Sequence, residues 1–322
     1  MVQNGFHIPV LANEIVAFLV RKPGIYVDGT LGGGGHSMAI LKALFESGYI
    51  KGSLLIGIDQ DDDALQQAGE TLKEFKPFTL LVKGNFEEMA TVIKKVCTEK
   101  NIQPKVAGIL LDLGVSSFQI DTAHRGFSYL RNGPLDMRMD SNTLSSAADI
   151  VNTYDELELA RIFYRYGEEP RSRGIAKAIV AYRLKHGLLI DTEELAGIIR
   201  AITYGRNNVI KTLSRVFQAL RIAVNRELDV LHEALYQGIS SLEDYGRMAV
   251  ISYHSLEDRI VKTVFAEKAR DNWGPKGVGL REPLERGSIS IFTRKPIVAT
   301  SQEIELNKRA RSAKLRLIEK IP

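Results

Sequence analysis

Apolar and polar positions alternate along the first third of the chain in blocks. Uninterrupted apolar runs predict buried strands at residues 25–28, 53–59, 78–84 and 106–114. Amphipathic segments between them predict helices at residues 37–45, 61–75 and 87–97. Strands without polar alternation, separated by helices, indicate a parallel sheet that is covered on both faces.

The pattern changes in the middle of the chain, where no comparable strand signal occurs. Thr153 and Glu156 resemble a capping box for a helix over 153–166, a second helix fits 173–186, and Asp191 with Glu194 predicts the start of a third. We therefore expect an inserted helical domain at residues 131–212. Its proposed role is substrate recognition.

The sheet pattern then resumes. Apolar residues at three- and four-residue steps from Leu213 to Leu235 predict one long helix, and 247–255 predicts a buried strand. Ser255, with Asp258 three residues later, is expected to cap a helix that ends near Ala269. Two late strands at 288–294 and 313–319 complete the pattern. The fold class is thus α/β, a doubly wound sheet formed by residues 1–130 and 213–322 and interrupted by the helical insertion.

Composition narrows the class of protein. The chain has 322 residues, 44% of them hydrophobic, and a single cysteine, Cys97. It shows neither an apolar run long enough to span a bilayer nor a signal peptide. The six histidines have no metal-binding spacing, so we expect no metal. The single cysteine and the lack of a signal peptide and of a membrane-spanning run predict a cytoplasmic location and no membrane partner. The net charge of +4 and the basic segment 307–316 favour a polyanionic partner only weakly, since a solvated tail explains the segment equally well.

Candidate chemistry lies where the predicted strands end. The stretch YVDGTLGGGGHS at residues 26–37 places Asp28 directly before a glycine loop, and Asp59, the turn at 84–86 and Asp112 end the next strands. Ligands of open parallel sheets bind at the carboxyl ends of the strands. These residues are therefore expected to line one crevice.

The loop fits a dinucleotide poorly. The G-x-G-x-x-G fingerprint fails, since Met38 stands where a third glycine would follow Gly33 and Gly35, and the carboxylate of Asp28 would repel a pyrophosphate. S-adenosylmethionine has a sulfonium and no phosphate, and is favoured. Asp59 would accept hydrogen bonds from its ribose, and Phe86 would lie against its adenine. A dinucleotide and a purely structural tight turn remain the alternatives.

Several longer motifs carry a resemblance to a known family. They are HIPVL (7–11), YVDGTLGGGGHS (26–37), GID (57–59), GNF (84–86), ILLDLGVSS (109–117), RGFS (125–128), GPLDMRMD (133–140), YGEE (166–169), FQALRIAVN (217–225), ISYHSLEDRIVK (251–262) and RARSAKLR (309–316). In this order the chain closely resembles the small-subunit ribosomal RNA methyltransferase H (MraW) family. The resemblance implies a methyltransferase version of the doubly wound sheet. It also implies S-adenosylmethionine-dependent N4-methylation of one cytidine in the decoding region of 16S ribosomal RNA, within the small ribosomal subunit.

The resemblance also implies roles for individual residues. Cofactor contacts are expected from Asp28, Gly34, Gly35, His36, Asp59, Phe86, Asp112 and Gln119. Two departures stand out. The family's usual Ser-Phe before HSLEDR is Ser252-Tyr253 here, and segment 210–216 differs, although Arg215 keeps a cation before Phe217.

The exocyclic amine of cytosine is a poor nucleophile, so an acceptor for its N–H would help to aim its lone pair at the methyl group. Asp112 is the first candidate, with a pure cofactor ligand as the alternative role, and His254 and Ser255 are further catalytic candidates. RNA contacts are expected from Arg125, Phe127, Arg138, Arg173, Arg215, Arg309 and Arg311, each of which is alternatively an ordinary surface or packing residue.

Two other functions stay open. A DNA amino-methyltransferase usually has an Asn/Asp-Pro-Pro-aromatic motif, whereas residues 112–115 read DLGV. A non-catalytic ribosomal RNA assembly factor would retain the cofactor pocket as a relic, which the intact acids and glycine loop disfavour. A homodimer is compatible with the sequence, which has no signal for or against it.

Overall fold

The computed structural model describes residues 9–274 and 281–322, so His7 and Ile8 of the HIPVL motif lie outside the described residues. The chain divides into two compact units. Unit 1 comprises the described parts of Met1–Gly114 and Leu228–Pro322, and unit 2 is Val115–Glu227. Unit 2 thus extends beyond the expected 131–212 at both ends.

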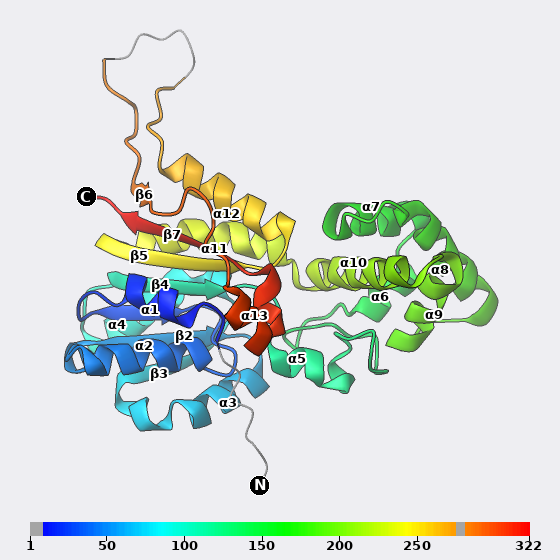
Figure 1. The fold of residues 1–322 in the computed structure, drawn as a ribbon, viewed down its shortest axis with the longest axis horizontal. Coiled ribbons are helices and arrows are strands. Elements are labelled where there is room, and N and C mark those ends of the chain that lie inside the picture. The colour runs from blue at the N-terminus through cyan, green and yellow to red at the C-terminus, as the bar shows by residue number, and fades with distance from the viewer. Residues whose placement is uncertain (1–8, 275–280) are drawn as a thin grey trace. The chain divides into compact units, whose positions relative to one another are not determined.

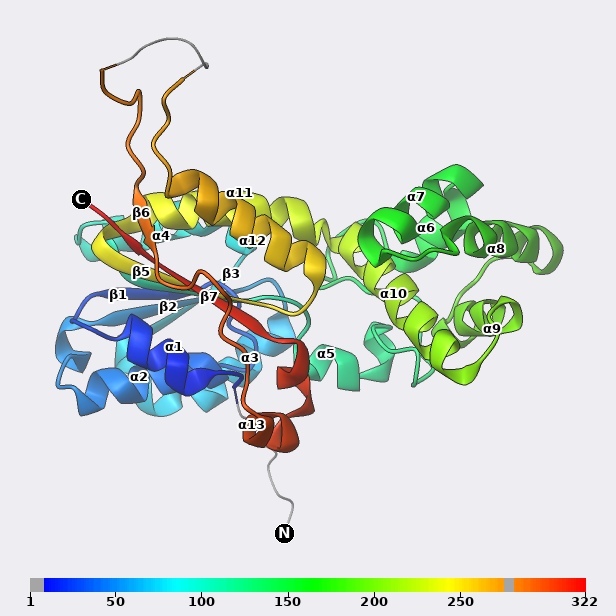
Figure 2. The same ribbon diagram turned by 45° about the horizontal axis from the view of Figure 1, so that its top comes forward.

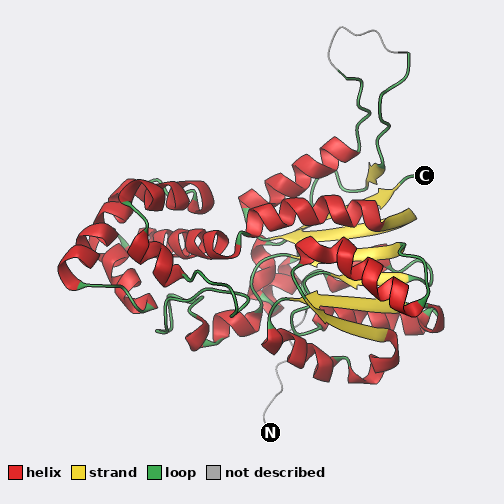
Figure 3. Ribbon diagram, turned by 180° about the vertical axis from the view of Figure 1, so that it is seen from behind, coloured by secondary structure: helices red, strands yellow, loops and turns green. Residues whose placement is uncertain are grey.

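Unit 1 is built on one seven-stranded sheet with the order β3-β2-β1-β4-β5-β7-β6. The first five of these strands are parallel, and β7 pairs antiparallel with β5 and β6 (Figures 1 and 3). The strands are β1 (Ile25–Asp28), β2 (Leu54–Asp59), β3 (Thr79–Lys83), β4 (Val106–Asp112), β5 (Leu242–Ser252), β6 (Ile289–Ile291) and β7 (Lys314–Lys320). The order reverses between β1 and β4, so the doubly wound fold predicted from the sequence is confirmed.

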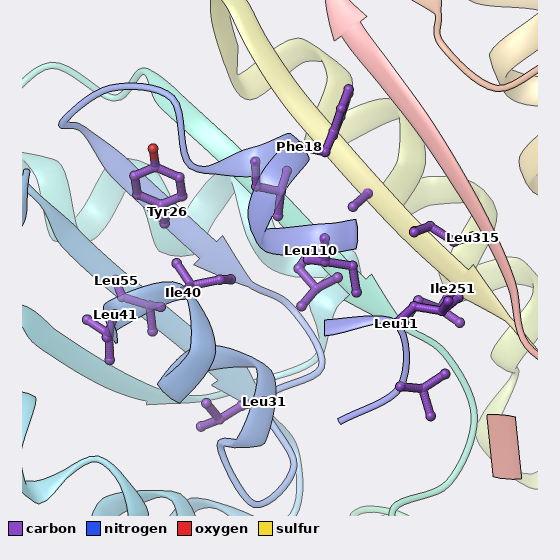
Figure 4. Packing of buried hydrophobic residues seen from close by; sticks show 14 of the residues in the cluster. Leu11, Phe18, Tyr26, Leu31, Ile40, Leu41, Leu55, Leu110, Ile251 and Leu315 are labelled. Atoms are coloured by element: carbon purple, nitrogen blue, oxygen red, sulfur yellow. The ribbon is translucent and has the colours of Figure 1, made fainter. Parts of the chain in front are cut away.

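Helices cover both faces of this sheet (Figure 2). One face packs against α1 (Ala12–Leu19), α2 (Gly35–Glu46) and α3 (Asp62–Thr71), and the other against α4 (Met89–Lys100), α11 (Glu227–Ser241) and α12 (Ser255–Lys268). On the first face, Tyr26, Ile40 and Leu110 pack from β1, α2 and β4 (Figure 4). The unit is completed by α13 (Ser301–Leu306) and by the short helices η1 (Ile50–Gly52), η2 (Lys73–Phe78), η3 (Phe86–Glu88) and η5 (Lys308–Ser312).

Unit 2 is helical and has its own apolar core. Its helices are α5 (Ser117–Asp121), η4 (Ala123–Arg125), α6 (Ala147–Thr153), α7 (Glu156–Gly167), α8 (Ser172–His186), α9 (Thr192–Ile202) and α10 (Arg206–Asn225). Phe163 of α7, Ile175 of α8 and Phe217 of α10 lie in one buried cluster. Because α10 packs there, the sequence boundary expected at residue 212 falls inside a helix of this unit.

Three local predictions were wrong. The long helix expected from Leu213 to Leu235 is two helices, because Arg226 adopts a left-handed conformation (φ 51°) between α10 and α11. The capping box of α7 is formed by Asp155 and Glu158, while the Thr153 hydroxyl donates to a carbonyl of α6. The apolar repeat continues across Arg226, so periodicity gave no sign of the break between α10 and α11. Several residues before α7 could have capped it, so the sequence did not single out Asp155.

The third error concerns α12, which is capped by His254 rather than by Ser255. An imidazole nitrogen supplies the acceptor that a serine hydroxyl usually supplies. Among residues 9–274 and 281–322, no helix combines the length and the apolar character needed to cross a membrane.

Candidate functional site

The glycine loop joins β1 to α2 and needs glycine for steric reasons. Gly34 has φ 81°, and a Cβ there would lie 3.4 Å from the backbone of Ala68. At Gly29, a Cβ would come within 2.6 Å of the Leu111 side chain on β4. The loop therefore follows a path that side chains would block, and it leads into α2, whose first N–H groups have no carbonyl partner within the helix.

Asp28 ends β1 and is 1% exposed. Its carboxylate accepts hydrogen bonds from the Ser37 hydroxyl (2.7 Å) and from the backbone N–H of Thr30 (3.2 Å). Burial raises the pKa of this carboxyl, although both hydrogen bonds oppose that shift. Since both oxygens hold the loop, Asp28 acts on the loop geometry.

Asp59 ends β2 and faces the same loop. One oxygen accepts the N–H of Gly32 (2.8 Å) and the other accepts the N–H of Asp61 (2.9 Å). Burial raises the pKa of Asp59 to about 6. Each carboxylate oxygen can accept a second hydrogen bond. The two oxygens of Asp59 can therefore still accept one hydrogen bond each, as two ribose hydroxyls require.

Asp112 ends β4 and is held from three elements. Its backbone N–H donates to the Thr30 hydroxyl (2.6 Å), Oδ1 accepts from the Tyr253 hydroxyl (2.8 Å), and Oδ2 lies 3.4 Å from Nδ1 of His36. Burial raises the pKa of Asp112, and the nearby His36 and Tyr253 oppose this. Its side chain remains 24% exposed, so a ligand can still reach the carboxylate.

His36, the second residue of α2, is 8% exposed. Its Nε2 lies 2.8 Å from the backbone carbonyl of Val10. Because a carbonyl can only accept, Nε2 must donate the hydrogen, and Nδ1 is the nitrogen that faces Asp112. His36 therefore connects the N-terminal segment to the carboxyl edge of β4.

Phe86 follows β3 and begins η3. It packs partly buried against the core of the second sheet face, and its Cβ would lie 3.3 Å from a Cβ placed at Gly29. Phe86 thus lies next to the start of the glycine loop. In unit 1 the structure brings together Asp28, the glycine loop, His36, Asp59, Phe86 and Asp112.

His254 and Ser255 lie at the start of α12, after the carboxyl end of β5. The His254 side chain faces Glu257, with Nε2 3.1 Å from Oε1, and Glu257 also accepts the N–H of Tyr253 (2.8 Å). Glu257 is 3% exposed and was missed by the sequence analysis. Its place in HSLEDR, three residues after His254, was the available signal.

Asp258, in the first turn of α12, contacts the last strand of the sheet. Its carboxylate pairs with Arg316 (2.7 Å) and Lys314 (3.3 Å) of β7. This triad fastens α12 to the antiparallel end of the sheet.

Several of the predicted residues in unit 2 serve its own structure. Gln119 forms a capping box with Ser116 at α5. Arg125 donates to the carbonyls of Arg138 and Met139, and Phe127 packs on the core of the unit. Arg138 binds both oxygens of Asp136 and two further carbonyls, so its donors are occupied internally.

The other predicted RNA contacts are more accessible. Arg173 is exposed on α8, and Arg215 is 43% exposed with Nη1 3.5 Å from the buried carboxylate of Glu169. In unit 1, Arg311 is exposed and Arg309 half-buried on η5.

The sequence analysis also missed a groove in unit 1, which we call the α12 groove. Its lining includes the exposed side chains of Lys262 and Arg270, for which the described part of the chain provides no acidic partner within 4 Å. The full lining is Arg259, Lys262, Thr263, Ala266, Glu267, Lys268, Arg270, Asp271, Asn272, Glu285, Arg286 and Ser288. The spacing of Arg259, Lys262, Ala266 and Arg270 at three and four residues was the available signal.

Three features define the class of this protein: the doubly wound sheet, a glycine loop without the dinucleotide fingerprint, and Asp59 at the end of β2, where a carboxylate can bind ribose hydroxyls. The protein is a methyltransferase of Rossmann-like fold that uses S-adenosylmethionine. The sequence profile of the MraW methylase family matches residues 4–321, and the chain belongs to this family.

Similar proteins span the same length. The chain is 73% identical to the ribosomal RNA small subunit methyltransferase H of Pelodictyon phaeoclathratiforme, over 100% of this chain and 97% of the relative. It is 60% identical to the protein of that name from Chlorobium luteolum, over 98% and 97%. A solved rRNA methylase from Streptococcus thermophilus matches with a TM-score of 0.41 and 11% identity, over 100% and 99% of the two chains.

Proposed function

We propose that the chain methylates ribosomal RNA of the small subunit at N4 of a cytidine in the decoding region. The names of its full-length relatives support the RNA class. The observation that carries the proposal is Asp112, an accessible carboxylate that ends β4 beside the glycine loop.

Asp59 and the loop that contains Gly34 and Gly35 would hold the cofactor, with Phe86 beside its adenine. These residues fit the cofactor. Asp59 can still accept hydrogen bonds from two ribose hydroxyls, and the loop contains no lysine or arginine that would repel a sulfonium. S-adenosylmethionine supplies an electrophilic methyl group when bound.

Asp112 would accept one N–H of the cytosine amine. That hydrogen bond would localise the nitrogen lone pair and orient it, and good orientation is worth about 7–11 kcal/mol of a barrier. The nitrogen would gain the methyl group as the sulfonium C–S bond breaks. The extra proton on the nitrogen would then pass to the Asp112 carboxylate or to water, so a strong base is unnecessary. His254, held by Glu257, would line the same edge, and Ser255 stays a candidate at the first turn of α12.

The RNA would be bound by accessible cations and not by those used internally. Arg173 of unit 2, Arg311 of η5, and Lys262 and Arg270 of the α12 groove meet this condition, and Arg215 and Arg309 meet it in part. We propose that unit 2 recognises the substrate. The target base must leave its stack before it can react.

The test is transfer of a labelled methyl group to three acceptors: naked ribosomal RNA, assembled small subunits and duplex DNA. We expect N4-methylcytidine in the small subunit. Labelling of duplex DNA alone would favour a DNA amino-methyltransferase. RNA binding without transfer would favour an assembly factor. Either result would refute the proposed function.

A further inference from the structure

The carboxylate of Asp112 receives its shortest side-chain contact from Tyr253, the residue after β5. The Tyr253 hydroxyl donates to Oδ1 at 2.8 Å, whereas Nδ1 of His36 lies 3.4 Å from Oδ2, beyond the range of a strong hydrogen bond. The ring of Tyr253 reaches the turn after β4, where a Cβ on Gly114 would lie 3.7 Å from it.

We propose that Tyr253 is a positioning residue that orients the Asp112 carboxylate toward the amine of the substrate. The proposal rests on the proposed function.

The carboxylate needs such a partner because its terminal torsion is broad and two-fold. Thr30 holds only the backbone of Asp112. With Oδ1 tied to Tyr253, the remaining lone pairs of the carboxylate point in fewer directions. A substrate N–H then meets an acceptor that is already oriented, and the cost of ordering it is removed from the reaction step.

The same hydrogen bond affects ionisation. Burial raises the pKa of Asp112, and His36 of α2 and the Tyr253 hydroxyl lower it, while Asp28 of β1 and Glu257 of α12 raise it further. Arg309 of η5 faces Tyr253. Loss of the hydroxyl therefore moves the pKa of Asp112 upward, and the carboxylate becomes protonated at higher pH.

Tyr253→Phe tests the proposal, because it keeps the ring and removes only the hydroxyl. We expect kcat to fall about ten- to hundredfold, the range for a hydrogen bond to a charged group. We expect the affinity for S-adenosylmethionine, measured by calorimetry, to stay within about twofold, since Asp59 and the loop are untouched. The acid limb of the kcat profile should move to higher pH.

Tyr236→Phe is the matched control. Its hydroxyl also donates to a carboxylate, that of Glu267 (2.7 Å) on α12, away from the strand ends. Because Glu267 lines the α12 groove, the comparison is made at saturating RNA, where this variant should leave kcat and the pH profile unchanged.

An unchanged kcat and acid limb in Tyr253→Phe would overturn the proposal, and so would a loss confined to cofactor affinity. If the wild-type protein does not methylate small-subunit RNA, the proposed function fails first. The positioning role is then tested without catalysis, by titrating labelled aspartate carboxyl carbons by NMR. An upward shift of the Asp112 pKa in Tyr253→Phe supports the hydrogen bond, and no shift refutes it.

Discussion

The carboxyl edge of the sheet in unit 1 and the arginine-containing loop of unit 2 both present charged groups, but they differ in what those groups contact. At the sheet edge, Asp59 and Asp112 accept hydrogen bonds from the chain and retain further lone pairs. In the loop, Arg125 and Arg138 direct their donors at neighbouring carbonyls and at Asp136. The first arrangement leaves capacity for a ligand, and the second stabilises its own turn.

This difference has a chemical origin. A carboxylate offers about four acceptor positions, so two backbone N–H groups do not saturate it. Arginine offers five donors in a rigid fork that closes readily around a carboxylate and nearby carbonyls. A motif with conspicuous arginines is therefore as compatible with a structural brace as with an RNA contact.

Asp112→Ala tests the ligand-binding side of this comparison and has the largest expected effect on activity. Loss of the acceptor should lower kcat at least a hundredfold, the lower range for a positioned proton acceptor. Affinity for S-adenosylmethionine should change little, because Asp59 remains. Single-turnover transfer and calorimetry measure the two quantities. Near-normal turnover would exclude the acceptor role, and a loss of affinity alone would assign Asp112 to cofactor binding.

Arg138→Ala tests the structural side of the comparison. It removes the bidentate contact to Asp136 and two carbonyl contacts, so the free energy of unfolding should fall by about 2 kcal/mol. Burial alone would raise the pKa of Asp136, but the hydrogen bonds from Arg138 hold it below its usual value. The loss should be present at neutral pH and shrink as the pH falls through that depressed pKa.

Arg173→Ala is the matched control for urea unfolding at pH 7, since its side chain is exposed on α8. It should leave stability within about 0.5 kcal/mol and weaken RNA binding. If Arg138→Ala were as stable as Arg173→Ala, the division between bracing and accessible arginines would be wrong.

Sequence reasoning succeeded where the backbone sets the geometry. Apolar runs located β1 to β4, and their final residues placed Asp28, Asp59 and Asp112 at one edge, because parallel strands end on the same side. It failed where side-chain pairing decides. The Tyr253–Asp112 hydrogen bond joins residues 141 positions apart, and the periodicity across Arg226 gave no sign of its left-handed turn. The internal use of Arg125 and Arg138 depends likewise on a loop path that spacing does not encode.

Asp59 predicts a smaller effect of pH on the cofactor site. Its pKa is raised to about 6, and the ionised form is the better acceptor for ribose hydroxyls. Affinity for S-adenosylmethionine should fall about tenfold between pH 7 and pH 5, following the ionised fraction. The contribution of Asp59 to the free energy of unfolding depends on pH in the opposite direction from the affinity. It is fully present below the unfolded pKa of Asp59 and is lost as the pH rises through 6. Calorimetry across pH 5–8 measures the affinity, and thermal unfolding from about pH 3.5, below the unfolded pKa, up to pH 8 measures the stability. A pH-independent affinity would separate Asp59 from the ribose.

The α12 groove predicts the smallest effect and extends the comparison to Lys262 and Arg270, two cations that have no acidic partner among the residues that the structure describes. Lys262→Gln and Arg270→Gln each remove one accessible charge from the groove. If these side chains bind phosphates, each variant should weaken RNA binding severalfold and reduce the salt slope by about 0.7 per charge on single-stranded RNA. Filter binding at several salt concentrations measures the slope. Lys42→Gln on α2 is the control for a general loss of charge and should reduce the slope by much less. Equal slopes in all three variants would show that the groove makes no special contact with RNA, and the accessible cations of unit 2 would then have to supply the binding.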